Sequence, residues 1–108
     1  MLNWGDFKEK LKSFIHAINS LFDITKIILF GSFARGDFHE NSDVDLVIVG
    51  KFKNRFFDRI GKILDLVPKG ITIEPFIYND EEIEKMIKKE NPFILNALSE
   101  GIILLSNE

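Results

Sequence analysis

The sequence of 108 residues contains no cysteine, which excludes a disulfide scaffold, a cysteine nucleophile and a thiolate metal site. Its longest unbroken apolar stretches are four residues, such as 27–30 and 102–105, which are too short to cross a membrane. The first residues carry charges where a signal peptide needs an apolar run, so we expect a cytoplasmic protein.

An excess of positive charge is also missing, because 14 basic residues face 17 acidic ones and the net charge is −3. Domains that bind duplex nucleic acid are usually basic, so we expect no binding to duplex DNA. Hydrophobic residues make up 45% and charged residues 29% of the chain, which is typical of a folded soluble protein. The length predicts a single domain over residues 1–108.

Hydrophobic periodicity and the positions of glycine, proline and asparagine predict the elements of the fold. We expect helices over 3–22, 54–67, 80–89 and 92–99, a helical turn at 32–36, and strands over 26–30, 43–49, 70–78 and 102–105. Asn54 and Asp80 are the expected N-caps of the second and third long helices. This order predicts an α/β or α+β fold with a mixed central sheet of about four strands flanked by helices.

The most informative stretch begins where the first strand ends in Gly31 and Ser32. A strand that turns into a helix presents free backbone N–H groups and the positive end of a helix dipole, which together bind phosphate. Gly31 allows a sharp turn and a close approach of the backbone to a ligand, and the Ser32 hydroxyl can add a hydrogen bond. The sequence therefore predicts a phosphate site at this turn.

Ten residues after Ser32 come Asp43 and Asp45, which are two apart on a predicted strand and so point to the same face. Two such carboxylates repel each other, and a divalent cation with a preference for oxygen ligands, Mg²⁺ above all, would relieve that repulsion. Glu74 is a third acid in the middle of the third predicted strand, on the face opposite its isoleucines. Three carboxylates beside a phosphate site are the set needed for phosphoryl or nucleotidyl transfer with one or two metal ions.

Other interpretations of these residues fit the context less well. A P-loop needs Gly-Lys-Ser/Thr, and an EF-hand needs further acids followed by glycine and glutamate; this stretch has neither pattern. Aspartyl phosphatases place Asp-x-Asp at the end of an apolar strand, whereas Asp43 and Asp45 begin one. A simple turn with two solvated acids is the remaining structural alternative. His39, between the two parts of the motif, is interpreted as a solvated loop residue.

Residues 27–49 resemble the nucleotidyltransferase signature of the DNA polymerase beta superfamily, in particular the minimal nucleotidyltransferases. That family pairs Gly-Ser with Asp-x-Asp about ten residues later, after a hydrophobic strand. The resemblance implies the fold of that superfamily, with Gly31 and Ser32 holding the triphosphate of a nucleotide.

The same resemblance implies roles for four charged residues. Asp43 and Asp45 would ligate Mg²⁺, and Glu74, where the family more often has aspartate, would be the third acid that binds the metal and activates the acceptor hydroxyl. Arg35, in a Ser-x-x-Arg-Gly run common in the family, would neutralise phosphate charge. The implied catalytic and metal-binding residues are therefore Asp43, Asp45 and Glu74, and the implied nucleotide-binding residues are Gly31, Ser32 and Arg35.

Minimal nucleotidyltransferases of this size resemble the partners of helical HEPN (higher-eukaryote-and-prokaryote nucleotide-binding) toxins. We therefore expect Mg²⁺-dependent transfer of NMP, with AMP from ATP as the leading choice, to a hydroxyl of such a partner protein, as an antitoxin. The short chain implies an acceptor on a separate macromolecule, or an oligomeric active form as homodimer or hetero-oligomer. The alternatives are a non-catalytic antitoxin that binds nucleotide and partner, for which an apolar patch left by the eleven phenylalanines would serve, and a small-molecule nucleotidyltransferase of the antibiotic-modifying kind.

Overall fold

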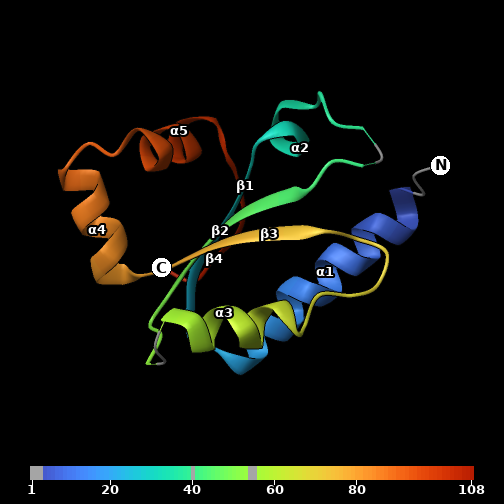
Figure 1. Ribbon diagram of the computed structural model, residues 1–108, viewed down its shortest axis with the longest axis horizontal. Helices are drawn as coiled ribbons and strands as arrows, with labels where there is room; N and C mark the ends of the chain where they lie inside the picture. The colour runs from blue at the N-terminus through green and yellow to red at the C-terminus, as the bar shows by residue number, and fades with distance from the viewer. Residues whose placement is uncertain (1–3, 40, 54–55) are drawn as a thin grey trace.

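The computed structural model describes residues 4–39, 41–53 and 56–108, whose elements follow the expected order (Figure 1). The helices are α1 (Trp4–Leu21), the short α2 (Ser32–Arg35), α3 (Phe56–Leu64), α4 (Asp80–Lys88) and α5 (Pro92–Glu100). The strands are β1 (Ile24–Phe30), β2 (Val44–Gly50), β3 (Ile73–Asn79) and β4 (Ile102–Ser106). The predicted fold class is confirmed, although β2 begins one residue and β3 three residues later than expected.

The four strands form one mixed sheet in the order β3-β2-β1-β4. β1 pairs antiparallel with β2 and β4, whereas β2 and β3 run parallel. A parallel pair requires a crossover, and α3 supplies it between β2 and β3. The sheet thus places the carboxylate-bearing starts of β2 and β3 side by side.

One face of the sheet, which we term the core face, packs against α1 and α3 (Figure 1). Its buried hydrophobic residues are Phe7, Phe14, Ile18, Ile24, Ile27, Val44, Leu46, Ile48, Ile63, Ile73 and Ile77. The isoleucines expected on the inner side of the third strand lie here, with Ile71 half-buried against them. Most of the described hydrophobic core is therefore on this side of the sheet.

The opposite face, which we term the site face, is covered by α4 and α5 (Figure 1). Its buried hydrophobic cluster is smaller, with Ile28, Val47, Val49 and Ala97. Half-buried side chains pack around that cluster: Phe30, Phe76, Tyr78, Ile83 and Phe93. Side chains alternate along β2, so Asp45 shares the site face with Val47 and Val49.

The N-cap of α4 is a correction to the sequence prediction, because Asn79 rather than Asp80 caps this helix. Asn79 accepts a hydrogen bond from the backbone N–H of Glu82 at 2.8 Å, and the Glu82 carboxylate accepts one from the backbone N–H of Asn79 at 2.8 Å. This is a capping box. The other predicted cap, Asn54, lies outside the described residues, and α3 ends at Leu64 rather than Val67.

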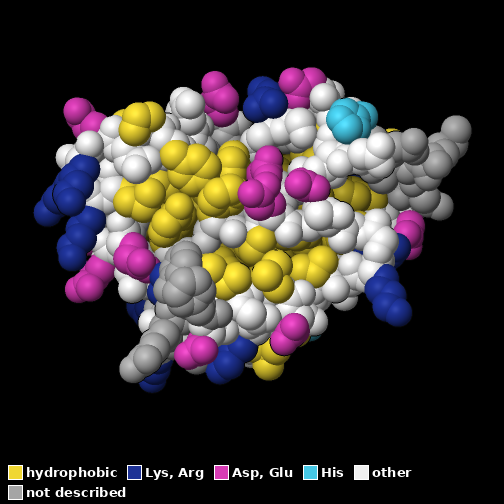
Figure 2. Space-filling model, viewed as in Figure 1, with side chains coloured by type: hydrophobic (Ala, Val, Ile, Leu, Met, Phe, Trp, Pro, Cys, Tyr) yellow, Lys and Arg dark blue, Asp and Glu magenta, His cyan; other side chains and the backbone are white. Residues whose placement is uncertain are grey.

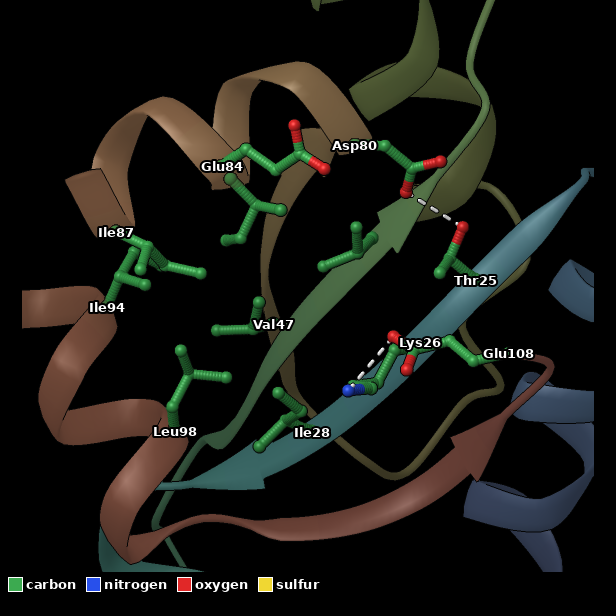
Figure 3. Close-up of a pocket in the computed structure, with 12 residues that line it drawn as sticks. Thr25, Lys26, Ile28, Val47, Asp80, Glu84, Ile87, Ile94, Leu98 and Glu108 are labelled. Carbon is green, nitrogen blue, oxygen red and sulfur yellow. Dashed lines mark hydrogen bonds and ion pairs between the residues drawn. The ribbon is translucent and has the colours of Figure 1, made fainter.

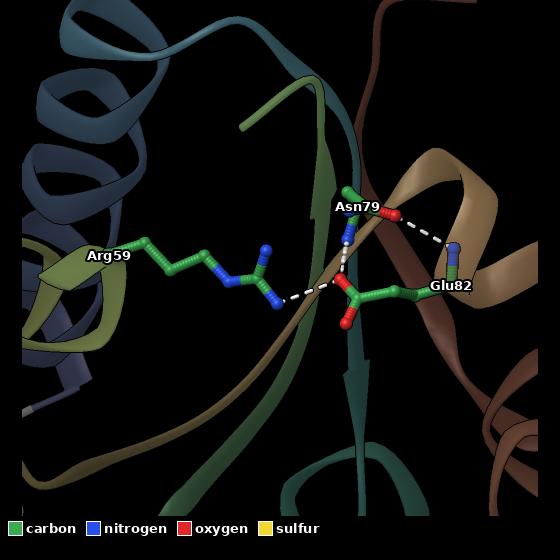
Figure 4. Close-up of polar contacts among 3 residues, drawn as sticks. All are labelled: Arg59, Asn79 and Glu82. Carbon is green, nitrogen blue, oxygen red and sulfur yellow. Dashed lines mark hydrogen bonds and ion pairs between the residues drawn. The ribbon is translucent and has the colours of Figure 1, made fainter. Parts of the chain in front are cut away.

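Glu82 also joins the two helical layers, since it accepts a hydrogen bond from Arg59 of α3 at 2.7 Å (Figure 4). Arg59 is 3% exposed and lies over the ring of Phe52. Buried guanidinium groups require such partners because burying an unpaired charge is costly.

The exposed large hydrophobic side chains of the described residues are tryptophan, leucine and isoleucine, not phenylalanine: Trp4, Leu21, Leu64, Ile87, Leu95, Leu98, Ile102 and Ile103. The expectation of an exposed phenylalanine patch is therefore wrong for the phenylalanines whose side chains are described. They are buried or half-buried in the two packed faces and beside α2. Within the described part of the chain, no helix is both long and apolar enough to span a membrane.

Candidate active site

Three neighbouring strands place Phe30, Asp45 and Glu74 in one row across the site face. Phe30 of β1 lies opposite Asp45 of β2 in the antiparallel register. Asp45 in turn lies beside Glu74 of β3 in the parallel register. Because residues paired across strands share a face, the two predicted carboxylates meet at the end of the sheet, with an aromatic ring next to them.

A cavity of about 340 Å³ lies over these acids. It is lined by Ser32, Arg35, Asp37, His39, Ser42, Asp43, Asp45 and Glu74. Five of the six predicted site residues are in this set, and the sixth, Gly31, borders it through its contact with Asp45. Figure 2 shows acidic side chains near the middle of this side of the molecule, with hydrophobic side chains beside them.

Gly31 is required by the geometry of the turn between β1 and α2. Its φ of 74° is in the left-handed range, and a Cβ at this position would overlap the carboxylate of Asp45. Gly36, with φ of 85°, closes α2 with its N–H donating to the carbonyl of Ser32 at 2.9 Å. Gly31 therefore lets the backbone of this turn pass close to Asp45, whereas a Cβ at Gly36 would meet nothing within 4 Å.

The carboxylates are crowded, which changes the proton affinity of Asp45. Burial, followed by the charge of Glu74, a hydrogen bond shared with Glu74 and the charge of Asp43, raises the pKa of Asp45 to about 6, while Arg35 acts in the opposite direction. Such repulsion between hard oxygen ligands is what a divalent cation would relieve, so the residue types fit Mg²⁺. Over the described residues, however, no three histidine, cysteine, aspartate or glutamate side chains are gathered as a metal-binding group. Metal binding stays a prediction.

Arg35 points to the same cavity but is already paired, because its Nε donates to Asp37 Oδ2 at 3.2 Å. Both side chains are more than half exposed, so the pair is weak and a phosphate could replace Asp37 as the partner of Arg35. Asp37, His39 and Ser42 were not predicted as site residues. The sequence could have indicated them, because they lie between the Gly-Ser pair and the Asp-x-Asp pair of the motif.

The loop that carries these residues is held by four aromatic rings. Phe33 of α2 stacks on Phe7 of α1 with ring centroids 5.0 Å apart and on Phe38 of the loop at 4.5 Å. Trp4 contacts Phe7 and Phe38 edge-on. Stacked rings of this kind stabilise by about 1 kcal/mol per pair beyond their burial. The cluster therefore anchors the residues after Ser32 to the long N-terminal helix.

Glu74 is followed by Pro75, which lacks the N–H that a central strand would use. β3 lies at the edge of the sheet, where a proline is tolerated because one side of the strand has no neighbour. Pro75 therefore leaves the register between Asp45 and Glu74 intact.

A separate cavity of about 350 Å³ lies away from the acids, between the other end of the site face and the two helices that cover it (Figure 3). Ile87, Ile94 and Leu98 face the strand residues Val47 and Ile28 across it. At its rim Thr25 donates a hydrogen bond to Asp80, and Lys26 pairs with Glu108. Its lining is mainly apolar and includes none of the predicted catalytic residues.

Comparison with known proteins identifies the class to which this site belongs. Residues 11–103 match the nucleotidyltransferase domain family. A crystal structure of a "putative nucleotidyltransferase" from Sulfolobus solfataricus superposes with a TM-score of 0.63 at 19% identity, over 92% of this chain and 79% of that one. That structure supports the fold.

Two relatives from Methanocaldococcus jannaschii carry more specific names. "Putative protein adenylyltransferase MJ0604" is 38% identical over 104 residues, which cover 90% of this chain and 96% of the relative. "Putative protein adenylyltransferase MJ1305" is 37% identical over 83 residues, which cover 71% of this chain and 55% of the relative. The chain belongs to the nucleotidyltransferase domain family, as a minimal nucleotidyltransferase.

Proposed function

We propose that this nucleotidyltransferase transfers AMP from ATP to a hydroxyl group of a partner protein in a Mg²⁺-dependent reaction, as the antitoxin of a HEPN-type toxin. The observation that carries the proposal is the cavity in which Ser32 and Arg35 face the carboxylates of Asp43, Asp45 and Glu74. The names of the Methanocaldococcus relatives support a protein acceptor and an adenylyl group.

In this proposal the acceptor hydroxyl oxygen attacks the α-phosphorus of ATP. The bond from the α-phosphorus to its bridging oxygen breaks, pyrophosphate leaves, and the hydroxyl proton passes to the carboxylate of Glu74. Ser32 and the backbone at Gly31 hold the leaving phosphates. Arg35 gives up its hydrogen bond to Asp37, donates to a phosphate oxygen instead and so compensates the negative charge. Mg²⁺ held by Asp43, Asp45 and Glu74 would supply Lewis-acid stabilisation of the developing charge.

One observation favours a second candidate, a module that neutralises its partner by binding alone. α4, α5 and β4 expose apolar residues such as Ile87, Leu98 and Ile103, which a partner protein could cover. Such a module would act without transferring a nucleotide, and its effect would survive loss of the carboxylates.

Label transfer separates the two candidates. The protein is incubated with Mg²⁺, α-phosphate-labelled ATP and lysate of the source cells, beside Asp43→Asn and the control Asp65→Asn, which changes an exposed acid outside the cavity. A labelled protein band that is absent only with Asp43→Asn supports adenylyl transfer to a protein. A labelled RNA band would move the acceptor to nucleic acid, and absence of label with any NTP would favour the binding module.

A further inference from the structure

His39 lines the cavity over the carboxylates, although it belongs to neither half of the Gly-Ser and Asp-x-Asp motif. It lies in the loop between α2 and β2, and its side chain is exposed. On one side of it, Phe38 stacks on Phe33 with ring centroids 4.5 Å apart. On the other side, the N–H of Val44 donates to the carbonyl of Thr72 at 2.8 Å. His39 is therefore carried to the cavity by a loop that is anchored at both ends.

Hydrogen bonds within this loop determine which ring nitrogen of His39 carries the proton. The backbone N–H of Asn41 donates to His39 Nδ1 at 3.2 Å. The backbone N–H of His39 donates to Ser42 Oγ at 2.9 Å, and the N–H of Ser42 donates to the carbonyl of His39 at 2.9 Å. Because Nδ1 accepts a hydrogen bond, the proton of the neutral ring is on Nε2. The ring therefore presents an N–H donor whose position is set by the loop.

The Nε2 donor of His39 is open to a ligand. Among the described residues, His39 Nε2 takes part in no hydrogen bond or ion pair, whereas the cation of the same cavity, Arg35, is already paired with Asp37. A donor that the protein holds in place binds a ligand at a smaller entropic cost than a mobile one, because less side-chain freedom is lost. His39 is thus prepared to bind a hydrogen-bond acceptor that enters the cavity.

The other residues of the cavity indicate which acceptor this is. Four of its eight described lining residues are acids, which repel phosphate: Asp37, Asp43, Asp45 and Glu74. The remaining four all carry groups that donate hydrogen bonds: Ser32, Arg35, His39 and Ser42. A triphosphate brings several negative charges into this acidic surrounding, so each of the few donors matters for holding it.

We infer that His39 positions the triphosphate of the bound nucleotide by donating a hydrogen bond from Nε2 to a non-bridging phosphate oxygen, an inference that rests on the proposed nucleotidyl transfer from ATP. Hydrogen bonds to an ionised acceptor such as phosphate are shorter and stronger than those between neutral groups. His39 thereby acts on the triphosphate and on the pyrophosphate that leaves, and Glu74 remains the group that takes the proton of the acceptor hydroxyl.

Two substitutions of His39 separate this role from a purely structural one. Asparagine places its side-chain oxygen near the position of Nδ1, where it still accepts from the N–H two residues further on, but it has no donor at the position of Nε2. Glutamine reaches the position of Nε2 with a donor and loses the acceptor at Nδ1. Phosphate binding should therefore survive in His39→Gln and weaken in His39→Asn, whereas a structural role gives the opposite order.

Calorimetric binding of inorganic triphosphate to the full chain in the presence of Mg²⁺, without acceptor, measures the effect. His39→Asn should weaken binding about tenfold, as expected for the loss of a hydrogen bond to a charged group, and His39→Gln by no more than about threefold. His16→Asn changes the other of the two histidines, which lies on α1 outside the cavity, and should leave binding unchanged. Nitrogen NMR of the wild type should show the neutral His39 ring protonated at Nε2, with a signal that triphosphate shifts while that of His16 stays in place.

Equal affinity of the wild type and His39→Asn for triphosphate would overturn the inference, as would tighter binding by His39→Asn than by His39→Gln. Triphosphate binding needs no acceptor, so label transfer succeeds or fails separately. Loss of binding in His39→Asn without any label transfer by the wild type would remove the proposed transfer and keep the role of His39. Label transfer together with unchanged binding in His39→Asn would remove only the role of His39, and a wild type that binds no triphosphate would remove both.

Discussion

Both faces of the sheet bury aliphatic side chains, but only the site face also carries the carboxylates of the candidate active site. Among the described residues, eleven buried hydrophobic side chains fill the core face between the strands and α1 and α3. On the site face the described residues include only five, the four of its cluster and Ile94 of α5. A cavity of about 350 Å³ lies between the strands and α4 and α5, and one of about 200 Å³ lies between β1, α2 and α5. Stability therefore comes mainly from one side of the sheet, which leaves the other side free to combine carboxylates, aromatic rings and open space.

The largest effect is expected at Asp45, on the site face. Asp45→Asn should reduce nucleotidyl transfer by about a thousandfold or more, since several kcal/mol of charge stabilisation at the transferred phosphate would be lost. The melting temperature should stay the same or rise, because one of three crowded carboxylates is removed. Transfer rates and thermal melting of the same preparation check this. A marked drop in melting temperature would make Asp45 a structural residue.

Ile27 and Ile28 offer a direct comparison, because they are adjacent isoleucines of β1 that face opposite sides of the sheet and are both buried. Ile27→Ala should lower the free energy of unfolding by about 4 kcal/mol, and Ile28→Ala by only about 2–3 kcal/mol. Ile28 already borders a cavity, so it makes fewer contacts that can be lost. Urea unfolding of both variants measures the difference; equal losses would contradict the division between the faces.

The contact between Glu82 and Arg59 joins the helical layers of the two faces (Figure 4). Glu82→Gln removes the carboxylate that faces a buried guanidinium and weakens the capping box of α4. We expect the free energy of unfolding to fall by about 2 kcal/mol. This is less than the usual cost of breaking a buried ion pair, because the Glu82 side chain is 40% exposed and water weakens the interaction. Glu81→Gln, next to it in the first turn, is the control and should have a smaller effect. Chemical denaturation of the two variants provides the comparison.

The smallest effect concerns pH. The pKa of Asp45 is raised from 3.8 to about 6, so the folded protein holds this proton more tightly than the unfolded chain. The contribution of Asp45 to the free energy of unfolding should therefore fall as pH rises from about 4 to about 6, and stay low above that range. Mg²⁺ should raise the melting temperature by a few degrees at pH 7.5 and very little at pH 4.5.

Asp45→Asn isolates this contribution from other titrating groups. The difference in melting temperature between the wild type and this variant should change with pH only in the window given above, and addition of EDTA should abolish the effect of Mg²⁺. A Mg²⁺ effect of the same size at both pH values would contradict the assignment to these carboxylates.

The sequence by itself determined the local features of this protein. Hydrophobic periods of two and of three to four residues reflect which face of each element is buried, so the order of helices and strands and the inner face of β3 followed from them. The spacing of Gly31, Ser32, Asp43 and Asp45 likewise indicated one site, because Gly31 and Ser32 are neighbours at one turn and Asp43 and Asp45 flank the first residue of β2. The cap at Asn79 was also within reach, since Asn-x-x-Glu is a capping-box pattern.

Only the tertiary structure decided which distant segments meet. The order β3-β2-β1-β4 and its register bring Glu74 beside Asp45 and Phe30, and no local period specifies the pairing of strands far apart in sequence. The sequence did not indicate that Asn96 and Glu100 of α5 line the same cavity as Arg35, because this depends on how α5 packs against β1 and α2. Short-range propensity acts within one element, whereas a cavity depends on how several elements pack, and that packing is a property of the whole chain.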